Sequence, residues 1–271
     1  MQPSRELLAD SCGEIGYESF IDTEDGITGY IQQDLYSELH VKEAIADFPI
    51  EGVSITFDTE DIPDQDWNEA WEAEGFEPIV VDGKLTIYDA HHVEDVEQFS
   101  TPLQIGIQTL NAFGTGTHET TRMVVSTLLQ LPLTGRRVLD CGCGTGILGI
   151  AALKCGASSV VAYDIDEFCF DNSRHNAVLN GVGEQMEVYL GNASVLSHVE
   201  GLFDVVLANI NRNILLADME AYHSVMSSDG RLVLSGFYEE DVPMLLQKAE
   251  ALGLHEVSRK SENGWCCLQL S

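Results

Sequence analysis

The sequence predicts an α/β fold in which a doubly wound, mostly parallel sheet follows a small N-terminal α+β module. From about residue 93, short apolar runs alternate with segments of helical periodicity, a pattern typical of parallel strands joined by helices. A glycine-rich turn links one predicted strand to a helix within VLDCGCGTGILGIAALKCGA, residues 138–157. In such sheets ligands bind beyond the carboxyl ends of the strands, so we expect the functional site there.

The predicted elements of this region follow one another closely. An apolar stripe of Met123, Val124, Leu128 and Leu129 predicts a first helix. Strands are predicted at residues 136–140, 159–163, 186–190, 203–208 and 231–235. Helices are predicted between them, at residues 147–155, 167–180, 212–226 and 241–252. Two final strands are predicted within residues 255–270, around the turn Asn263-Gly264.

The first 60 residues predict a smaller unit in the order helix, strand, strand, helix, strand. The helices lie near residues 4–12 and 35–45, and the strands include residues 27–33 and 54–58. A ferredoxin-like unit would begin with one more strand. Because the first helix follows Met1 almost directly, that strand is missing from this sequence or the unit is incomplete.

The segment between the two parts is acidic. TEDIPDQDWNEAWEAEG, residues 59–75, predicts a linker with a short helix that carries Trp67 and Trp71. After it, FEPIVV and LTIY flank Asp82-Gly83, which predicts a β-hairpin. We therefore predict a first domain over residues 1–60, a linker with helix and hairpin over 61–92 and a main domain over 93–271.

Composition narrows the class of partner. The chain has 13 basic and 45 acidic residues, a net charge of −32. Such a charge repels nucleic-acid phosphates and attracts basic partners, although it also serves solubility alone. Seven cysteines without a C-x-x-C pair predict free thiols in a reducing compartment and no zinc site. With no long apolar run and no signal-peptide pattern, we expect a cytoplasmic protein without a membrane contact.

The glycine turn limits the choice of ligand. A phosphate-binding loop of the G-x-x-x-x-G-K-[ST] type would need a lysine that is absent here. The dinucleotide fingerprint G-x-G-x-x-G is not matched either, because Asp140 precedes glycines at alternate positions, Gly142, Gly144 and Gly146. The turn therefore reads D-x-G-x-G-x-G and favours another nucleotide-like ligand.

Two polar residues at strand ends complete the pattern. Asp164 ends the next predicted strand, 22 residues after Gly142, where its two oxygens match the vicinal hydroxyls of a ribose. The alternative, a helix N-cap, suits Asp166 better. Asn209 ends the strand FDVVLAN and places an amide beside the turn. Together the three features resemble the seven-stranded, Rossmann-like methyltransferases that use S-adenosylmethionine.

A closer resemblance lies in AFGTGTHETTR, residues 112–122. On its own this segment is an N-terminal helix cap with Thr117 or Thr120 as the capping residue. Followed by DCGCGTGILGIAALKCGA and by the strand end ANI, it resembles the ribosomal protein L11 methyltransferases, the PrmA family. The resemblance covers residues 93–271 well and the N-terminal module in outline, which in that family docks the ribosomal protein.

The resemblance implies the residues of the site. By position, the cofactor residues are Thr121, Gly142, Asp164 and Asn209. Gly144 then lets the backbone approach the methionine part, and Asp140 orients its amino group directly or through water. Asn192 is expected beside the adenine ring. His118 is expected either to accept a proton or to make a structural hydrogen bond.

The resemblance also implies a reaction. S-adenosylmethionine is the expected cofactor, and lysine side chains, an N-terminal α-amine or both are the expected acceptors, oriented by Asn209 without a dedicated general base or a metal. The expected partner of this lysine N-methyltransferase is a basic ribosomal protein, with no direct nucleic-acid contact, and the enzyme is expected to be a monomer. Three alternatives stay open: a methyltransferase for a small molecule or another protein, an NAD-dependent oxidoreductase, and a non-catalytic adenosyl-binding module.

Overall fold

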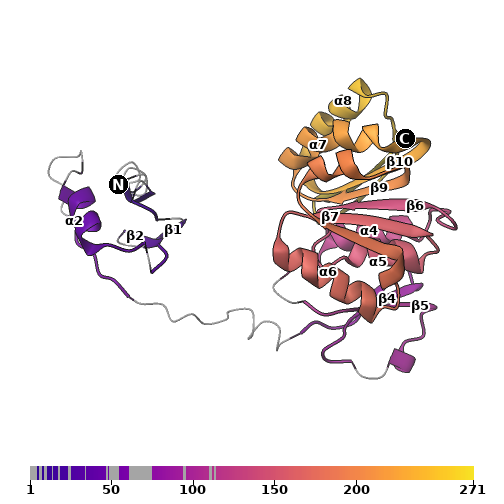
Figure 1. Cartoon of the computed structure of the whole chain (residues 1–271), viewed down its shortest axis with the longest axis horizontal. Coiled ribbons are helices and arrows are strands. Elements are labelled where there is room, and N and C mark those ends of the chain that lie inside the picture. The colour runs from indigo at the N-terminus through magenta and orange to yellow at the C-terminus, as the bar shows by residue number, and fades with distance from the viewer. Residues whose placement is uncertain are drawn as a thin grey trace. The chain divides into compact units, whose positions relative to one another are not determined.

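The computed structural model divides the chain into two compact units, Met1–Gln65 and Asp66–Ser271. It describes residues 5, 8, 11–13, 15–17, 19–23, 26–33, 35–46, 48 and 55–60 of the first unit, and residues 75–93, 96–109, 112 and 114–271 of the second (Figure 1). The two units are taken one at a time below.

The first unit contains a small antiparallel sheet and a helix. Strands β1 (Ser19–Asp22) and β2 (Ile27–Tyr30) pair with Ser19 opposite Tyr30, and helix α2 (Glu38–Ala46) follows. The described residues within the predicted first helix are helical. The strand predicted at 54–58 is wrong over residues 55–58, which form no strand. No described strand lies beside this segment, and a strand needs such a neighbour for its backbone hydrogen bonds.

The second unit is built on the predicted seven-stranded sheet, whose order is β11-β12-β10-β9-β6-β7-β8. Its parallel strands are β6 (Arg137–Cys141), β7 (Ser159–Asp164), β8 (Met186–Leu190), β9 (Phe203–Asn209) and β10 (Met226–Tyr238). The last two strands, β11 (Glu256–Glu262) and β12 (Trp265–Leu270), are antiparallel. The predicted fold class is confirmed.

Helices cover both faces of this sheet (Figure 1). They are α4 (Glu119–Leu128), α5 (Ile147–Lys154), α6 (Glu167–Leu179), α7 (Arg212–Ser224) and α8 (Val242–Ala251). Short 3-10 turns are η1 (Val96–Gln98), η2 (Gly183–Gln185), η3 (Ala193–His198) and η4 (Glu239–Asp241). Strand residues alternate between two cores: Val138 packs with α4 and α5, and Leu139 packs with α7 and α8.

The predicted hairpin belongs to the second unit rather than to a linker. Strands β3 (Ile79–Val81) and β4 (Leu85–Asp89) are antiparallel, and β5 (Leu103–Ile107) runs parallel to β4. Asp82 and Gly83 both have positive φ, 50° and 65°, as a two-residue hairpin turn requires. Leu85 and Ile87 of β4 and Ile105 and Ile107 of β5 are fully buried in one core with α4 and α5, which is why this segment joins the main unit. The helix predicted around Trp67 and Trp71 lies outside the described residues.

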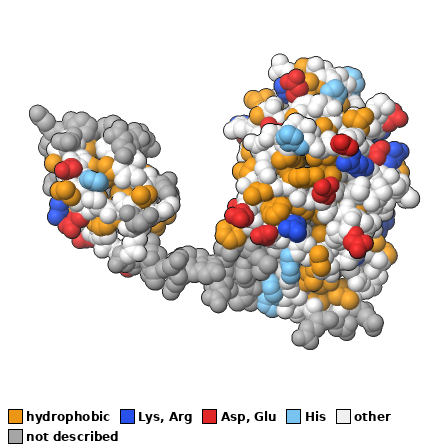
Figure 2. All heavy atoms as spheres, viewed as in Figure 1, with side chains coloured by type: hydrophobic (Ala, Val, Ile, Leu, Met, Phe, Trp, Pro, Cys, Tyr) orange, Lys and Arg blue, Asp and Glu red, His pale blue; other side chains and the backbone are white. Residues whose placement is uncertain are grey.

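Two surface properties bear on function. On the face of the second unit seen in Figure 2, Asp and Glu side chains are scattered rather than gathered in one patch. Within the described part of the chain, every helix is too short or too polar to cross a membrane.

Candidate active site

A cavity of about 980 Å³ opens at the carboxyl ends of the parallel strands of the second unit. Most of the residues predicted for the site line it: Thr121, Gly142, Gly144, Asp164, Asn192, Asn209 and also His118. These residues come from α4 and its preceding loop and from the ends of β6, β7, β8 and β9. The topology therefore brings together residues that are up to 91 positions apart, from His118 to Asn209.

The glycine turn forms one wall. Gly142, Gly144 and Gly146 have φ values of 67°, 53° and 80°, a region that favours glycine. A Cβ on Gly142 would lie 2.5 Å from the side chain of Ile210. The backbone N–H groups of Gly142 and Cys143 both donate to the carbonyl oxygen of Tyr163 in β7. The turn is thus fixed by backbone geometry, and its two lining glycines, Gly142 and Gly144, expose backbone to the cavity beside Cys143.

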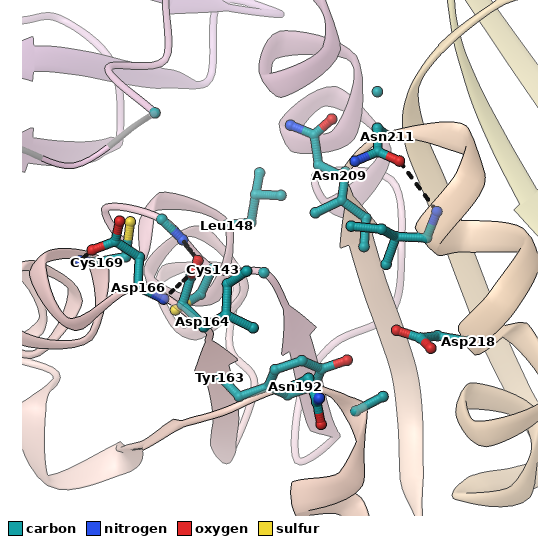
Figure 3. A pocket seen from close by; sticks show the side chains of 18 of the residues that line it. Cys143, Leu148, Tyr163, Asp164, Asp166, Cys169, Asn192, Asn209, Asn211 and Asp218 are labelled. Atoms are coloured by element: carbon teal, nitrogen blue, oxygen red, sulfur yellow. Dashed lines mark hydrogen bonds between the residues drawn. The ribbon is translucent and has the colours of Figure 1, made fainter. Parts of the chain in front are cut away.

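Asp164 is anchored beside this turn. Its Oδ2 accepts a hydrogen bond from the N–H of Gly144 at 2.8 Å, and its Oδ1 accepts one from the N–H of Asp166 at 3.1 Å (Figure 3). A carboxylate has about four acceptor sites, so each oxygen retains capacity for a ligand hydroxyl. Asp166 caps α6 by accepting from the N–H groups of Phe168 and Cys169, which confirms the prediction that Asp166 is the helix cap.

Asp140 does not line the cavity. It lies fully buried behind the turn, where its Oδ2 accepts a hydrogen bond from the N–H of Gly149 at 2.8 Å and its Oδ1 has no partner among the described residues. Burial raises the pKa of this carboxyl to about 7. From this position Asp140 supports the turn from behind. Its side chain does not reach the cavity to contact a ligand directly.

Asn209 stands on the opposite side, at the end of β9. Its Oδ1 is buried without a hydrogen-bond partner among the described residues, which leaves an acceptor free for a ligand. The next residue, Ile210, is enclosed by two glycines, because a Cβ on Gly236 would lie 2.5 Å from the Ile210 carbonyl oxygen. Gly236 has a φ of 91° and sits in a bulge of β10. The close approach of these backbones fixes the direction of Asn209.

Aromatic rings complete this side of the cavity. Trp265, at the start of β12, lines it and makes an edge contact with His118, with ring centroids 4.7 Å apart. Tyr238 stacks on the other side of Trp265 at 4.1 Å. His118 is also the N-cap of α4, since its Nδ1 accepts from the N–H of Thr120. The expectation that Thr117 or Thr120 caps this helix is therefore wrong, and His118 makes the structural hydrogen bond.

The charges around the cavity suit a cation. Its ionisable side chains include the carboxyls of Asp164, Asp166 and Asp218, and no lysine or arginine is among the described residues that line it. Burial raises the pKa of Asp218, which points towards the cavity from α7 (Figure 3). A dinucleotide would bring a pyrophosphate without a basic side chain to meet it, whereas a positively charged ligand is favoured.

Comparison with known proteins decides the family. Residues 10–271 match the family model described as ribosomal protein L11 methyltransferase (PrmA). The chain belongs to this family. It is 42% identical over 264 residues to the ribosomal protein L11 methyltransferase of Phocaeicola vulgatus and 44% identical over 264 residues to that of Bacteroides fragilis, and each match covers 97% of this chain and 92% of the relative.

A solved structure gives the same answer for the fold. The ribosomal protein L11 methylase of Lactobacillus delbrueckii subsp. bulgaricus superimposes with a TM-score of 0.64 at 27% identity, covering 72% of this chain and 98% of that chain. Membership of the PrmA family confirms the resemblance inferred from AFGTGTHETTR, the glycine-turn segment and the strand end ANI.

Four residues that line the cavity were not predicted from the sequence to belong to the site. Tyr163, Asp218, Gly236 and Trp265 all line it, yet each lies in an ordinary strand or helix pattern. Gly236 is a single glycine within an apolar strand, which suggests a bulge but not a ligand. Trp265 follows the Asn263-Gly264 turn, and only the antiparallel pairing of β12 with β10 brings it to the cavity.

Proposed function

We propose that this chain transfers methyl groups from S-adenosylmethionine to amines of ribosomal protein L11, on lysine side chains, the N-terminal α-amine or both. The observation that carries the proposal is the cavity, where the anchored carboxylate of Asp164 and the free amide oxygen of Asn209 lie on opposite sides (Figure 3). The names of relatives at 42% and 44% identity support the choice of substrate.

The residues of one side suit the parts of the cofactor. Asp164 retains acceptor capacity for the two ribose hydroxyls. Gly142, Gly144 and Thr121 line the cavity; we expect the two glycines to let the backbone approach the methionine part and the hydroxyl of Thr121 to bond its carboxylate or amine. Asn192, which caps η3 by accepting from Ser194 at 2.9 Å, borders the cavity where we expect the adenine ring.

The other side suits an amine. S-adenosylmethionine supplies a methyl group on a sulfonium, an electrophile that needs mainly proximity and alignment. The acceptor nitrogen forms a bond to the methyl carbon as the carbon–sulfur bond breaks, and the amine then loses a proton to solvent. A free lysine has a pKa of about 10.4, and desolvation beside the sulfonium lowers that pKa. The Oδ1 of Asn209 accepts an N–H of the amine and so directs its lone pair.

Charge and the first unit define the partner. The whole chain has a net charge of −32, and Asp and Glu side chains are scattered over the visible face of the second unit (Figure 2), so the charge attracts a basic protein over long range rather than at one patch. We assign docking of the ribosomal protein to residues 1–60 and methyl transfer to residues 93–271. We further infer a monomer that acts in the cytoplasm, in keeping with its seven free cysteines, without direct contact to nucleic acid.

Calorimetric titration tests the cofactor. Wild type, Asp164→Ala and the control Asp171→Ala are each titrated with S-adenosylmethionine and with NAD. Asp171 is exposed on α6, so its replacement removes the same charge without touching the cavity. We expect S-adenosylmethionine to bind wild type and the control but not Asp164→Ala. Binding of NAD alone would overturn the proposal.

Methyl transfer to purified ribosomal protein L11 tests the substrate. We expect turnover by the full chain, with a marked loss at high salt because the attraction between the partners is screened. Removal of residues 1–60 should abolish this turnover and leave cofactor binding intact. If cofactor binds but L11 is not methylated by the full chain, the alternative of a small molecule or another protein is favoured.

A further inference from the structure

Helix α6 carries asparagines four residues apart, Asn172 and Asn176 within the helix and Asn180 at its C-cap. Residues at this spacing lie on one face of a helix. Asn172 and Asn176 are 1% and 0% exposed. Amides are seldom buried this deeply unless their donors and acceptors are paired, so we expect this face of the helix to form specific hydrogen bonds.

Two of these amides form the backbone hydrogen bonds with β5 that a neighbouring strand would otherwise form. Asn180 accepts from the N–H of Gly106 at 3.0 Å and donates to the carbonyl oxygen of Gly106 at 2.7 Å. Asn176 does the same for Gln108, with both distances 3.0 Å. Each amide thus pairs with the N–H and the carbonyl of one residue, and the two residues alternate as along a strand edge. Helix α6 holds β5 and the residue that follows it in register.

Asn176 alone continues from this edge to the glycine turn. Its Nδ2 also donates to the carbonyl oxygen of Thr145 at 3.0 Å. The hydroxyl of Thr145 donates in turn to the carbonyl oxygen of Gly114 at 2.6 Å. Thr145 is fully buried between Gly144 and Gly146, and Gly114 lines the cavity. A chain of hydrogen bonds therefore runs from Gln108 through Asn176 and Thr145 to the cavity wall.

Gly114 and Thr145, at the end of this series of hydrogen bonds, lie close together. Gly114 has a φ of 116°, and a Cβ at that position would lie 3.1 Å from the hydroxyl oxygen of Thr145. The carbonyl of Gly114 and the glycine turn are thereby held at a fixed separation on two sides of the same cavity. Asn172 adds a second donor to the carbonyl oxygen of Gln108 at 2.9 Å, so the start of the chain is held independently of Asn176.

We propose that Asn176 is a positioning residue for cofactor binding, which fixes the glycine turn against the Gly114 wall through Thr145. The inference rests on the proposed function in taking this cavity as the S-adenosylmethionine site. Without Asn176, the carbonyl oxygen of Thr145 loses a buried donor, so the Thr145 end of the turn is held less firmly relative to Gly114. The bonds of the turn to β7 remain. Since Gly142 and Gly144 present backbone to the ligand, a small shift of the turn acts directly on affinity.

Asn180 provides a matched control. It makes the same pair of bonds to β5 and one to the carbonyl oxygen of Asn176, but its described bonds do not reach the glycine turn. Asn176→Ala and Asn180→Ala should both lower the thermal midpoint. We expect Asn176→Ala to weaken S-adenosylmethionine binding about tenfold, the effect of one buried hydrogen bond, and Asn180→Ala to change the Kd less than about twofold. Equal changes in Kd, or none, would overturn the proposal.

A second variant keeps the proposal testable if Asn176→Ala fails to fold. Asn176→Asp keeps the shape and the acceptor for the N–H of Gln108 but loses the donor to the carbonyl oxygens of Thr145 and Gln108, the second of which still accepts from Asn172. It should weaken binding at neutral pH in the same direction and recover part of the affinity at acid pH, where a protonated carboxyl donates again. Binding that is unaffected by Asn176→Asp at every pH contradicts a relay through Thr145.

A double-mutant cycle with Thr145→Val tests the chain itself. The substitution removes the hydroxyl that bonds Gly114 with little change of shape. If the two residues act in series, the Kd of the double variant should lie within about twofold of the Kd of Asn176→Ala. Effects on Kd that multiply as for independent sites would refute the relay. Wild type without any S-adenosylmethionine binding would instead refute the proposed function.

Discussion

The two ends of the cavity are built in different ways. Most of the cofactor end comes from one continuous stretch, β6, the glycine turn, α5 and β7, that runs from Arg137 to Asp166, and Thr121 and Asn192 join it from outside this stretch. The acceptor end is assembled from His118, Asn209, Gly236 and Trp265, which belong to four separate parts of the chain. The first end is determined by local backbone conformation, and the second depends on how distant strands pair.

The forces differ accordingly. At the cofactor end, backbone N–H groups of the turn donate to Tyr163 and Asp164. At the acceptor end, contacts are between rings, and between Ile210 and the glycines that enclose it. We therefore expect changes at the first end to weaken cofactor binding and changes at the second to lower turnover while the cofactor still binds.

The largest effect is expected for Gly142→Ala. Alanine at this position must adopt a φ of 67°, and its Cβ would lie 2.5 Å from the side chain of Ile210. The turn must move to relieve this contact, so we expect S-adenosylmethionine binding to weaken about a hundredfold, which corresponds to about 3 kcal/mol. Gly135→Ala is the control, because Gly135 has a φ of 76° with no atom near the new Cβ. Titration of both variants checks this. A comparable loss of affinity in Gly135→Ala would mean that strain, not position, causes the effect.

Gly236→Ala should separate the two ends. Its Cβ would press on the backbone of Ile210 and turn Asn209 away from the acceptor, so we expect kcat to fall about thirtyfold with the cofactor Kd nearly unchanged. Gly253→Ala shares the positive φ, 83°, without a neighbour, and should retain wild-type kcat. If Gly236→Ala weakened cofactor binding as much as Gly142→Ala does, the division of the cavity into two ends would be wrong.

Predictability from sequence follows the same division. Residues 138–166 could be read in advance, because a strand, a turn with three glycines and an acid at the next strand end are local patterns with local causes. The alternation of strands and helices likewise predicted the sheet, since periodicity reports burial on one or two faces. Asn209 was found because it ends a strand beside that turn.

Trp265 and Gly236 show what sequence reading misses. Their role exists only because β12 returns antiparallel beside β10 and places Trp265 opposite Tyr238, a pairing that no local pattern encodes. The hairpin at Asp82-Gly83 illustrates a related limit. Its turn was predicted correctly, but its assignment to a linker missed the burial of Leu85 and Ile87 against α4 and α5.

A smaller effect is expected for Trp265→Ala. Loss of the ring removes the contacts with His118 and Tyr238 and widens the acceptor end, so we expect kcat/KM for ribosomal protein L11 to fall about tenfold. Trp265→Phe keeps an aromatic face and should retain most of the activity. Cofactor affinity serves as the internal control and should stay at the wild-type value. Equal activity of the Ala variant and wild type would show that Trp265 does not contribute to binding of the acceptor.

The smallest effect on the cavity is expected for Asp140→Asn, because Asp140 lies behind the turn and asparagine retains an acceptor for the N–H of Gly149. Its effect is on stability. The carboxyl has a pKa near 3.8 when unfolded and about 7 when folded. Between these values the native state holds a proton that the unfolded state has released, so wild type loses stability as the pH rises, with a limiting slope of about 1.4 kcal/mol per pH unit.

Asparagine does not ionise, so Asp140→Asn should gain stability relative to wild type as the pH rises from about 5 to about 7, and the difference should then level off. Urea unfolding of both proteins across this range measures the difference in unfolding free energy. A difference that is constant with pH would mean that Asp140 is ionised in the folded protein throughout. In that case the carboxylate must be stabilised within the folded protein by a partner of its Oδ1.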